Sequence, residues 1–359
     1  MIVVGIDPHK NTHTAVAVQG ATGAEVATIT VKARQKGHER LITWARSLHP
    51  DIRFAVEDCR HVSGGLQRFL LARGERMVPV PPKLMAGARR GARTRGKSDP
   101  IDARAVAHAA LRHPDLPAAH LAGVERDVRV LVDHREDLVA ERTRAQNRLR
   151  WHLHDLDPDF FVPTGGLDRY VWLDRTRDHL EVMERTVQVR VALEQVSHIR
   201  ELTRGAKALE RELTTLMRLI APELLAIRGC AALTAAKLLG ETGGVRRFRS
   251  EAAFAMHAGV SPLEVSSGEQ HRHRLNRSGN RQLNAALHRI AVTQKRIHPP
   301  AQAFLLRKQQ EGQSEREALR CLKRHLARHV YKTLLRIERR NDPETAQKES
   351  LAVDLAESA

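Results

Sequence analysis

Near its N-terminus the chain reads IVVGIDPHKNTHTAVAV over residues 2–18. Two runs of apolar and β-branched residues, 2–8 and 13–18, predict two strands, and Asp7 stands near the end of the first. The turn sequence GATG then leads to a third predicted strand at 25–32. We therefore expect three successive strands, with an aspartate where the first one ends.

The pattern then alternates between helix and strand. A predicted strand, RFAVE, ends on Glu57, and Pro81-Pro82 break the last strand because proline cannot donate to a strand ladder. The predicted elements are helices at 37–48 and 64–73 and strands at 53–57 and 76–80. With one more helix after Pro82, the order βββαβαβα implies a mixed sheet flanked by helices.

A strongly basic connector, residues 83–97, precedes the sequence SDPIDARAVAHAAL. Ser98 can cap a helix that has Pro100 in its first turn, and the negative charge of Asp99 suits a helix N-terminus. Asp99 and Asp102 are three residues apart. The two carboxylates are therefore expected on one face of this helix.

Two stretches carry apolar residues at near-heptad spacing, which predicts long helices. The first, within 121–157, is interrupted by polar residues, and the second, within 202–220, is cleaner. An antiparallel or intermolecular coiled coil and a helical bundle within one subunit both explain the pattern. The segment between the stretches, 157–170, has a loop-like composition.

A further unit is expected at 227–292, where it opens with IRGCAALTAAKLLGETGG. The glycine turn between apolar helices resembles a helix–hairpin–helix, whose turn offers backbone N–H groups to a phosphate. A charged helix is predicted at 315–340.

The charge of the chain points to a polyanionic partner. Lys and Arg number 60 against 42 Asp and Glu, which gives a formal charge of +18 and a pI near 10.7. Nucleic acid is the commonest partner of so basic a protein. The sequence has no apolar run of about 18 residues and no signal-peptide pattern, so we expect a cytoplasmic, nucleoid-associated protein without a membrane partner.

Four carboxylates could form one acidic cluster. If the strands that end on Asp7 and Glu57 are neighbours, as in an RNase-H-like sheet, both side chains point into one cleft. The helix with Asp99 and Asp102 can complete the cluster from one face of the sheet. Mutual repulsion would be relieved by divalent cations, and carboxylate ligands suit Mg²⁺ or Mn²⁺.

Each acidic motif alone more often has a structural role. An aspartate after a strand is usually a turn residue, and two aspartates at a helix start usually serve capping. Their order along the chain and the basic connector before the second motif favour a site. Asp58 is the weaker candidate, because strand alternation points it to the opposite face from Glu57.

Several motifs together resemble one family. GIDPHKNTHTAVAV, AVEDC and KSDPIDARAVA look like the RuvC-like DEDD domain of the bacterial insertion-sequence transposase family numbered one hundred and ten. The segment from IRGCAALTAAKLLGETGG to RLNRSGNRQLNAAL looks like the C-terminal transposase domain of that family. The similarity spans both ends of the chain, and the two blocks occur in the family's order.

The resemblance implies an α/β fold followed by an α fold. We expect a RuvC-like (RNase-H-like) catalytic domain at 1–120, a helical coiled-coil region at 121–222, a C-terminal transposase domain at 223–310 and a partly disordered helical tail at 311–359. After Glu57 the family commonly has Thr-Gly, whereas this chain has Asp58-Cys59-Arg60 before Ser63. The loop after Glu57 is therefore expected to differ.

The resemblance also implies a composite active site. The metal ligands and catalytic carboxylates would be Asp7, Glu57, Asp99 and Asp102. A serine beside a glycine would be the nucleophile, which matches Ser267, with Ser266 as the alternative. A homodimer or homotetramer would bring the serine to the carboxylates. A structured noncoding bridge RNA would guide excision and insertion by pairing with donor and target DNA.

Basic side chains that could contact nucleic acid gather in three places: the first turn, the connector and the segment after the serine. They are Lys10, Arg89, Arg90, Arg93, Arg95, Lys97, Arg272, Arg274, Arg277 and Arg281.

Two other functions fit part of the sequence. A RuvC-like nuclease or junction resolvase would use the same carboxylates with activated water, and an architectural DNA binder would use no carboxylates. Tyr331, in RHVYKTLL, superficially suggests a tyrosine nucleophile, but its surroundings are typical of an amphipathic helix.

Overall fold

The computed structural model describes residues 1–58, 60–82, 84–85, 98–118, 123–267, 270–276 and 279–341. The chain divides into two compact units. One combines Met1–Ala122 with Gly243–Arg339, and the other combines Gly123–Thr242 with the C-terminal end. No helix in the described ranges is both long and apolar enough to cross a membrane.

The N-terminal part is built on a five-stranded mixed sheet in the order β3-β2-β1-β4-β5. β1 pairs antiparallel with β2 and parallel with β4. This arrangement is the RNase-H-like sheet that the sequence predicts. The strands are β1 (Ile2–Pro8), β2 (Thr12–Gln19), β3 (Glu25–Lys32), β4 (Ile52–Glu57) and β5 (Met77–Val80).

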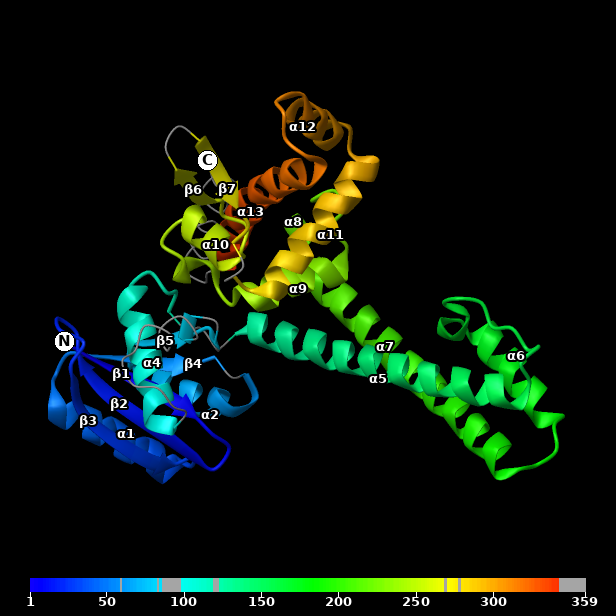
Figure 1. Cartoon of the computed structure of the whole chain (residues 1–359), viewed down its shortest axis with the longest axis horizontal. Coiled ribbons are helices and arrows are strands. Elements are labelled where there is room, and N and C mark those ends of the chain that lie inside the picture. The colour runs from blue at the N-terminus through cyan, green and yellow to red at the C-terminus, as the bar shows by residue number, and fades with distance from the viewer. Residues whose placement is uncertain are drawn as a thin grey trace, which may run out of the picture. The chain divides into compact units, whose positions relative to one another are not determined.

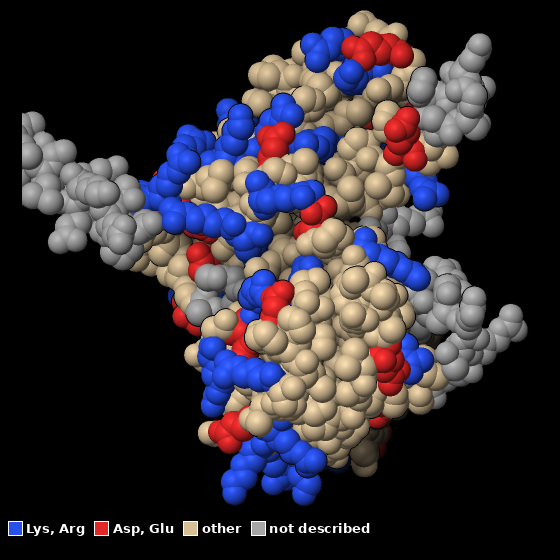
Figure 2. All heavy atoms as spheres, turned by 90° about the vertical axis from the view of Figure 1, so that its left-hand side faces the viewer, with Lys and Arg blue, Asp and Glu red and all other residues tan. Residues whose placement is uncertain are grey.

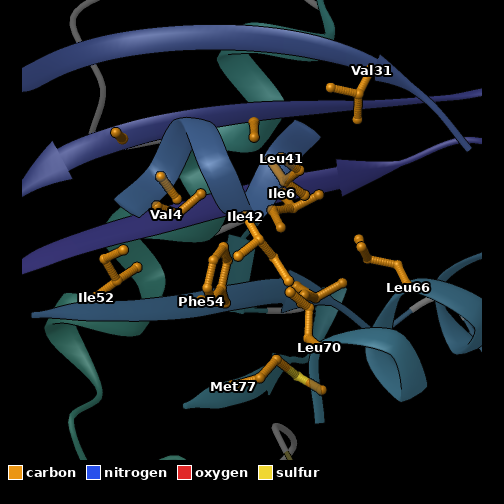
Figure 3. Packing of buried hydrophobic residues seen from close by; sticks show 14 of the residues in the cluster. Val4, Ile6, Val31, Leu41, Ile42, Ile52, Phe54, Leu66, Leu70 and Met77 are labelled. Atoms are coloured by element: carbon orange, nitrogen blue, oxygen red, sulfur yellow. The ribbon is translucent and has the colours of Figure 1, made fainter. Parts of the chain in front are cut away.

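Helices cover both faces of this sheet (Figure 1). On one face, α1 (Gln35–Leu48) and α2 (Arg60–Leu71) pack over the even-numbered residues of β1 and β4. Figure 3 shows the large side chains of this core, among them Ile6, Phe54 and Leu66. On the other face lies α4 (Asp99–Arg112), which buries the odd-numbered residues of the same strands.

Helix α2 begins four residues earlier than the predicted 64–73 and ends two residues earlier. The helix runs through Gly64 and Gly65, although glycine lowers helix propensity. The buried Ser63 stabilises this first part, because the amide Nε2 of Gln67 donates to its hydroxyl at 2.8 Å.

The second unit is dominated by two long helices, α5 (Val124–Leu156) and α7 (Val187–Ile220). Polar contacts pair Arg135 with Glu210 and Asp155 with Gln188, so the helices run antiparallel within one chain. Helix α6 (Tyr170–Glu181) and the buried apolar residues of both long helices share one core. Helix α9 (Ala232–Thr242) packs on α5.

The segment expected to resemble a helix–hairpin–helix has an unequal pair of helices. α8 (Pro222–Leu225) is only four residues long, and Gly229 adopts a φ of 84° in the turn before α9.

In its described residues, the C-terminal part of the first unit contains a two-stranded hairpin, four α-helices and the short 3-10 helix η2 (Val245–Arg247). The hairpin consists of β6 (Leu263–Ser267) and β7 (Gln270–Arg274). The charged helix predicted at 315–340 is present with those bounds. The helices are α10 (Glu251–His257), α11 (Arg281–Ile297), α12 (Pro299–Gln310) and α13 (Glu315–Arg340).

Candidate active site

Asp7 and Glu57 lie side by side at the ends of two parallel strands. β1 and β4 pair with Ile6 opposite Val56, so the next residue of each strand falls at the same edge of the sheet. Strand alternation puts both carboxylates on the face that α4 covers. Their side chains are within hydrogen-bonding distance of each other.

Gly5 allows α4 to approach the sheet closely enough to join this pair. A Cβ atom on Gly5 would lie 2.2 Å from the carbonyl oxygen of Ala103 and 2.4 Å from the backbone nitrogen of Ala107. Only glycine leaves room for a helix backbone at that distance. Gly5 and Asp7 share one face of β1, so the close approach brings the start of α4 to Asp7.

The first turn of α4 carries the other two carboxylates. Asp102 is 6% exposed, and its charge acts on Asp7. Asp99 is exposed at the first helical position. Ser98 is the N-cap residue as predicted, but its side chain makes no capping hydrogen bond. The Ser98 carbonyl instead accepts a hydrogen bond from the backbone N–H of Asp102.

His9 is a member of the cluster that the sequence did not single out. Its Nε2 lies 3.1 Å from Oδ2 of Asp7 and 3.4 Å from Oδ1 of Asp99. One ligand atom from each of these three residues lies within 4.8 Å of the others. The signal in the sequence was a histidine two residues after a strand-end aspartate, in a turn that brings it back toward the sheet edge.

The electrostatics of Asp7 reflect its crowded position. Burial raises the pKa of Asp7 above its ordinary value, and the charge of Asp102 adds to that rise. The charge of His9, together with hydrogen bonds from His9 and Glu57, lowers the pKa and offsets part of the increase. Like charges at close range are costly, so the carboxylate form of Asp7 needs a compensating positive charge nearby.

The predicted serine lies in the C-terminal hairpin. Ser267 is the last residue of β6 and pairs with Gln270, while Ser266 pairs with His271. Side chains at 266–272 lie outside the described part of the chain. Among described residues, the groups that shift the pKa of Asp7 come from β4, α4 and the turn after β1, and none comes from this hairpin.

The structure describes the side chains of only three of the residues predicted to contact nucleic acid. Lys10 is exposed in the turn after β1, Arg274 is exposed at the end of β7, and Arg281 is exposed at the start of α11. Figure 2 shows Lys and Arg side chains gathered in patches on one face, with fewer acidic side chains between them. Outside the described side chains lie Arg89, Arg90, Arg93, Arg95, Lys97, Arg272 and Arg277.

Tyr331 lies in α13, where it packs against neighbouring residues. Its hydroxyl donates to the carbonyl oxygen of Phe248 at 3.3 Å, and its ring lies 5.7 Å from that of Phe254. Burial raises the pKa of the Tyr331 hydroxyl, which opposes its use as a nucleophile.

Two family models match this chain. A model of DEDD transposases, described as Transposase, matches residues 4–158, and a second, described as Transposase IS116/IS110/IS902 family, matches residues 221–306. The chain belongs to the IS110 family of transposases. As an IS110-family transposase it is an enzyme that acts on DNA.

Relatives of this IS110-family chain cover most of its length. It is 27% identical to the "Insertion element IS116 uncharacterized 44.8 kDa protein" of Streptomyces clavuligerus, over 90% of this chain and 92% of the relative. It is 25% identical to the "Insertion element IS900 uncharacterized 42 kDa protein" of Mycobacterium paratuberculosis, over 71% of this chain and 76% of the relative.

Among solved structures, the chain is similar to RuvC of T. thermophilus in complex with a Holliday junction substrate. The match has a TM-score of 0.26 and 16% identity, and covers 33% of this chain and 99% of RuvC.

The residues of the acidic cluster fit a divalent cation. Asp7, His9 and Asp99 offer oxygen and nitrogen donors close enough together to share one ion, and Asp102 and Glu57 add carboxylates around Asp7. Oxygen-rich donor sets suit hard divalent cations. Divalent-metal dependence is also what the DEDD family implies.

Proposed function

We propose that this transposase excises and inserts its own element by metal-assisted phosphoryl transfer, with Ser267 as nucleophile. Asp7, Glu57, Asp99 and Asp102 would hold Mg²⁺ or Mn²⁺. The convergence of four carboxylates on one sheet edge, around the buried Asp7, is the observation that carries this proposal.

The cluster would act on a phosphodiester at the exposed edge of the sheet. Bound divalent ions would stabilise the charge that develops on the attacking and leaving oxygens. The protein's own contribution is positioning: β1, β4 and α4 fix the carboxylates, since each sits at the end of a regular element. His9 would orient Asp7 and Asp99, because it lies within 3.4 Å of both.

The serine would conserve the free energy of the phosphodiester bond that is broken in the DNA strand. Its hydroxyl oxygen would bond to phosphorus as the strand's P–O bond breaks, its proton would pass to a base, and the leaving oxygen would take up a proton. A phosphoserine could then be attacked by another strand's hydroxyl, so strands would be resealed without ATP. Ser266 is the alternative nucleophile.

Ser267→Ala tests the serine, with Ser197→Ala, at an exposed position of α7, as the control. Strand exchange between donor and target DNA should be lost in Ser267→Ala and kept in the control. Retained exchange in Ser267→Ala would contradict the serine mechanism. Loss of exchange in Asp102→Asn, together with residual hydrolysis in Ser267→Ala, would support a mechanism in which the carboxylates and the serine cooperate. Hydrolysis alone in the wild type would instead identify a RuvC-like nuclease.

Guidance by a structured noncoding RNA is a second element of the proposal. The formal charge of +18 suits two nucleic-acid partners. RNA transcribed from the sequence beside the gene should copurify with the protein and be required for exchange. Exchange by RNA-free protein at an undiminished rate would contradict guidance.

A homodimer or homotetramer is the third element, because one assembly must hold donor and target DNA. We also propose that the functional regions have the boundaries 1–120, 121–222, 223–310 and 311–359. Light scattering with and without DNA tests assembly, and a strictly monomeric protein under both conditions would contradict it.

A further inference from the structure

A cavity of about 790 Å³ lies at the base of the β6–β7 hairpin. Its walls come from the turn 259–262 after α10, the end of β7, and residues of α12 and α13 that follow much later in the chain. Figure 1 shows the hairpin and α13 in this part of the molecule. The volume falls within the range of pockets that bind small ligands or parts of larger ones.

The ionisable lining of this cavity is strongly unbalanced. Among the described residues, five Lys and Arg side chains and two histidines line it, against the single carboxylate of Glu317. The five are Arg274, Lys308, Arg320, Lys323 and Arg324. A concave surface with one sign of charge concentrates ligands of the opposite sign.

Three of these cations lack an acidic partner in the described ranges. Lys308 pairs with Glu311 and Arg324 with Glu251, which satisfies part of their charge. Within the part of the chain that the structure describes, no carboxylate lies within ion-pairing distance of Arg274, Arg320 or Lys323. These three side chains are therefore available to an external anion.

Lys323 makes the strongest case, because its side chain is buried. Lys323 is 7% exposed, and its Nζ donates to the neutral Oδ1 of Asn284 at 3.0 Å. Burial, and then the like charge of Arg320, lowers the pKa of Lys323. Buried ammonium groups are usually paired with an acid, and a bound anion would supply the missing negative charge.

We propose that this cavity binds a backbone phosphate of a nucleic-acid strand through Arg274, Arg320 and Lys323. Arginine matches the two free oxygens of a phosphodiester with its planar fork of donors, and lysine adds a compact charge. Arg274 ends the strand that pairs with the strand of Ser267. A phosphate bound at the base of the hairpin would therefore fix the position of the hairpin along the nucleic-acid strand.

Cys321 provides a direct probe of occupancy. Its half-buried thiol lines the cavity and donates to Oε1 of Gln313 at 3.4 Å, whereas Cys230 is buried elsewhere. The wild-type protein is labelled with N-ethylmaleimide, and the Cys321 peptide is quantified by mass spectrometry. Saturating oligonucleotide should slow labelling of Cys321 at least fivefold.

Three probes of one sequence identify the source of the phosphate: single-stranded DNA, duplex DNA and RNA. Protection of Cys321 by any of the three supports the site. The oligonucleotide that protects most strongly identifies the kind of strand that the site binds. Unchanged labelling at saturation with all three would overturn the proposal.

Charge-matched variants provide the second test. Arg274→Gln/Arg320→Gln removes two cations from the cavity, and Arg316→Gln/Arg339→Gln removes two exposed cations of α13 that do not line it. Fluorescence anisotropy with the best probe should show about tenfold weaker binding for the cavity variant. The slope of log affinity against log salt should fall by about 0.7 for each lost contact with a single strand.

Equal losses in the two double variants would overturn the proposal, because only overall charge would then matter. The inference rests on the proposed function in that it takes nucleic acid as the ligand. Both measurements are made with a chelator and need neither the carboxylates nor Ser267. Their failure would therefore leave the strand-exchange proposal standing, and the reverse also holds.

Discussion

The molecule gathers charge of one sign in two places, and they differ in how they are built. At the sheet edge, carboxylates from β1, β4 and α4 crowd around Asp7. At the base of the hairpin, cations from β7, α12 and α13 surround a cavity. Like charges are costly at short range, so each place is expected to be stabilised by a ligand of opposite sign. The comparison indicates a cation at the first and an anion at the second.

The two places also depend differently on the backbone. The acidic cluster needs a helix backbone in contact with a strand at Gly5. The basic cavity is formed between elements and carries its charge on long side chains. Backbone changes should therefore disrupt the acidic cluster most, and charge changes should affect the cavity more gradually.

The largest expected effect comes from Gly5→Val. The new side chain would overlap the backbone of α4, so the free energy of unfolding should fall by roughly 3 kcal/mol or more. Strand exchange should be lost with it. Urea denaturation measures the change.

Gly65→Ala is the matched glycine control. Gly65 lies in α2, and an added Cβ would meet no atom within 4 Å. Alanine should stabilise the helix by up to about 1 kcal/mol. Equal stability of the two variants would contradict the close approach of α4 to β1.

Asp102→Asn should separate chemistry from folding. The change removes a carboxylate from the acidic cluster but keeps the side chain's size, so DNA strand cleavage should fall at least about 100-fold while the fold persists. Asp127→Asn removes an exposed aspartate from the first turn of another helix, α5, and should leave cleavage unchanged. Equal cleavage by Asp102→Asn and wild type would exclude Asp102 from the site.

Acidification should destabilise the packing on the face of the sheet opposite to the acidic cluster. His13 and His38 stack under the sheet with their Nε2 atoms 3.2 Å apart. Burial, and then the charge of His38, lowers the pKa of His13 to about 4. Since the unfolded chain binds this proton near pH 6.5, the stabilisation is present above that pH and is lost as pH falls toward 4. The loss should be roughly 2–3 kcal/mol.

Urea denaturation at pH 7 and pH 4.5 checks this dependence. His13→Phe keeps an aromatic ring in place and should reduce the difference in unfolding free energy between the two pH values. His113→Phe changes an exposed histidine after α4 and should leave the difference as in wild type. An unchanged difference in His13→Phe would contradict the neutral buried pair.

The smallest expected effect is that of Tyr331→Phe. The change removes one hydrogen bond to the Phe248 carbonyl, which costs about 1 kcal/mol or less, and strand exchange should continue. Abolished exchange in a folded variant would favour a tyrosine nucleophile and contradict Ser267.

The sequence predicted the sheet because its strands have strong apolar patterns and clear breaks. It also predicted that Asp7 and Glu57 would be neighbours, since their strands pair in an RNase-H-like order. It did not single out His9, because the turn that returns this side chain to Asp7 is a three-dimensional feature. The role of Gly5 was missed for the same reason: periodicity does not show which backbone lies against a strand.

The basic cavity was beyond sequence reasoning. Arg274 and Arg320 are separated by more than one helix along the chain. They line the same cavity only because the elements that carry them pack together. The long helices were predicted correctly as helices, but heptad spacing alone did not decide between one chain and two. Contacts such as that of Arg135 with Glu210 show that α5 and α7 pair within the chain. The roles of Ser267, the guide RNA and the region boundaries stay predictions.

Binding of Mn²⁺ to metal-free protein tests the central claim most directly. Isothermal titration calorimetry of the full chain should give saturable binding for the wild type and for Asp127→Asn. Asp102→Asn should bind at least about tenfold more weakly. Mn²⁺ affinity of Asp102→Asn equal to that of the wild type would contradict a metal site at the edge of the sheet.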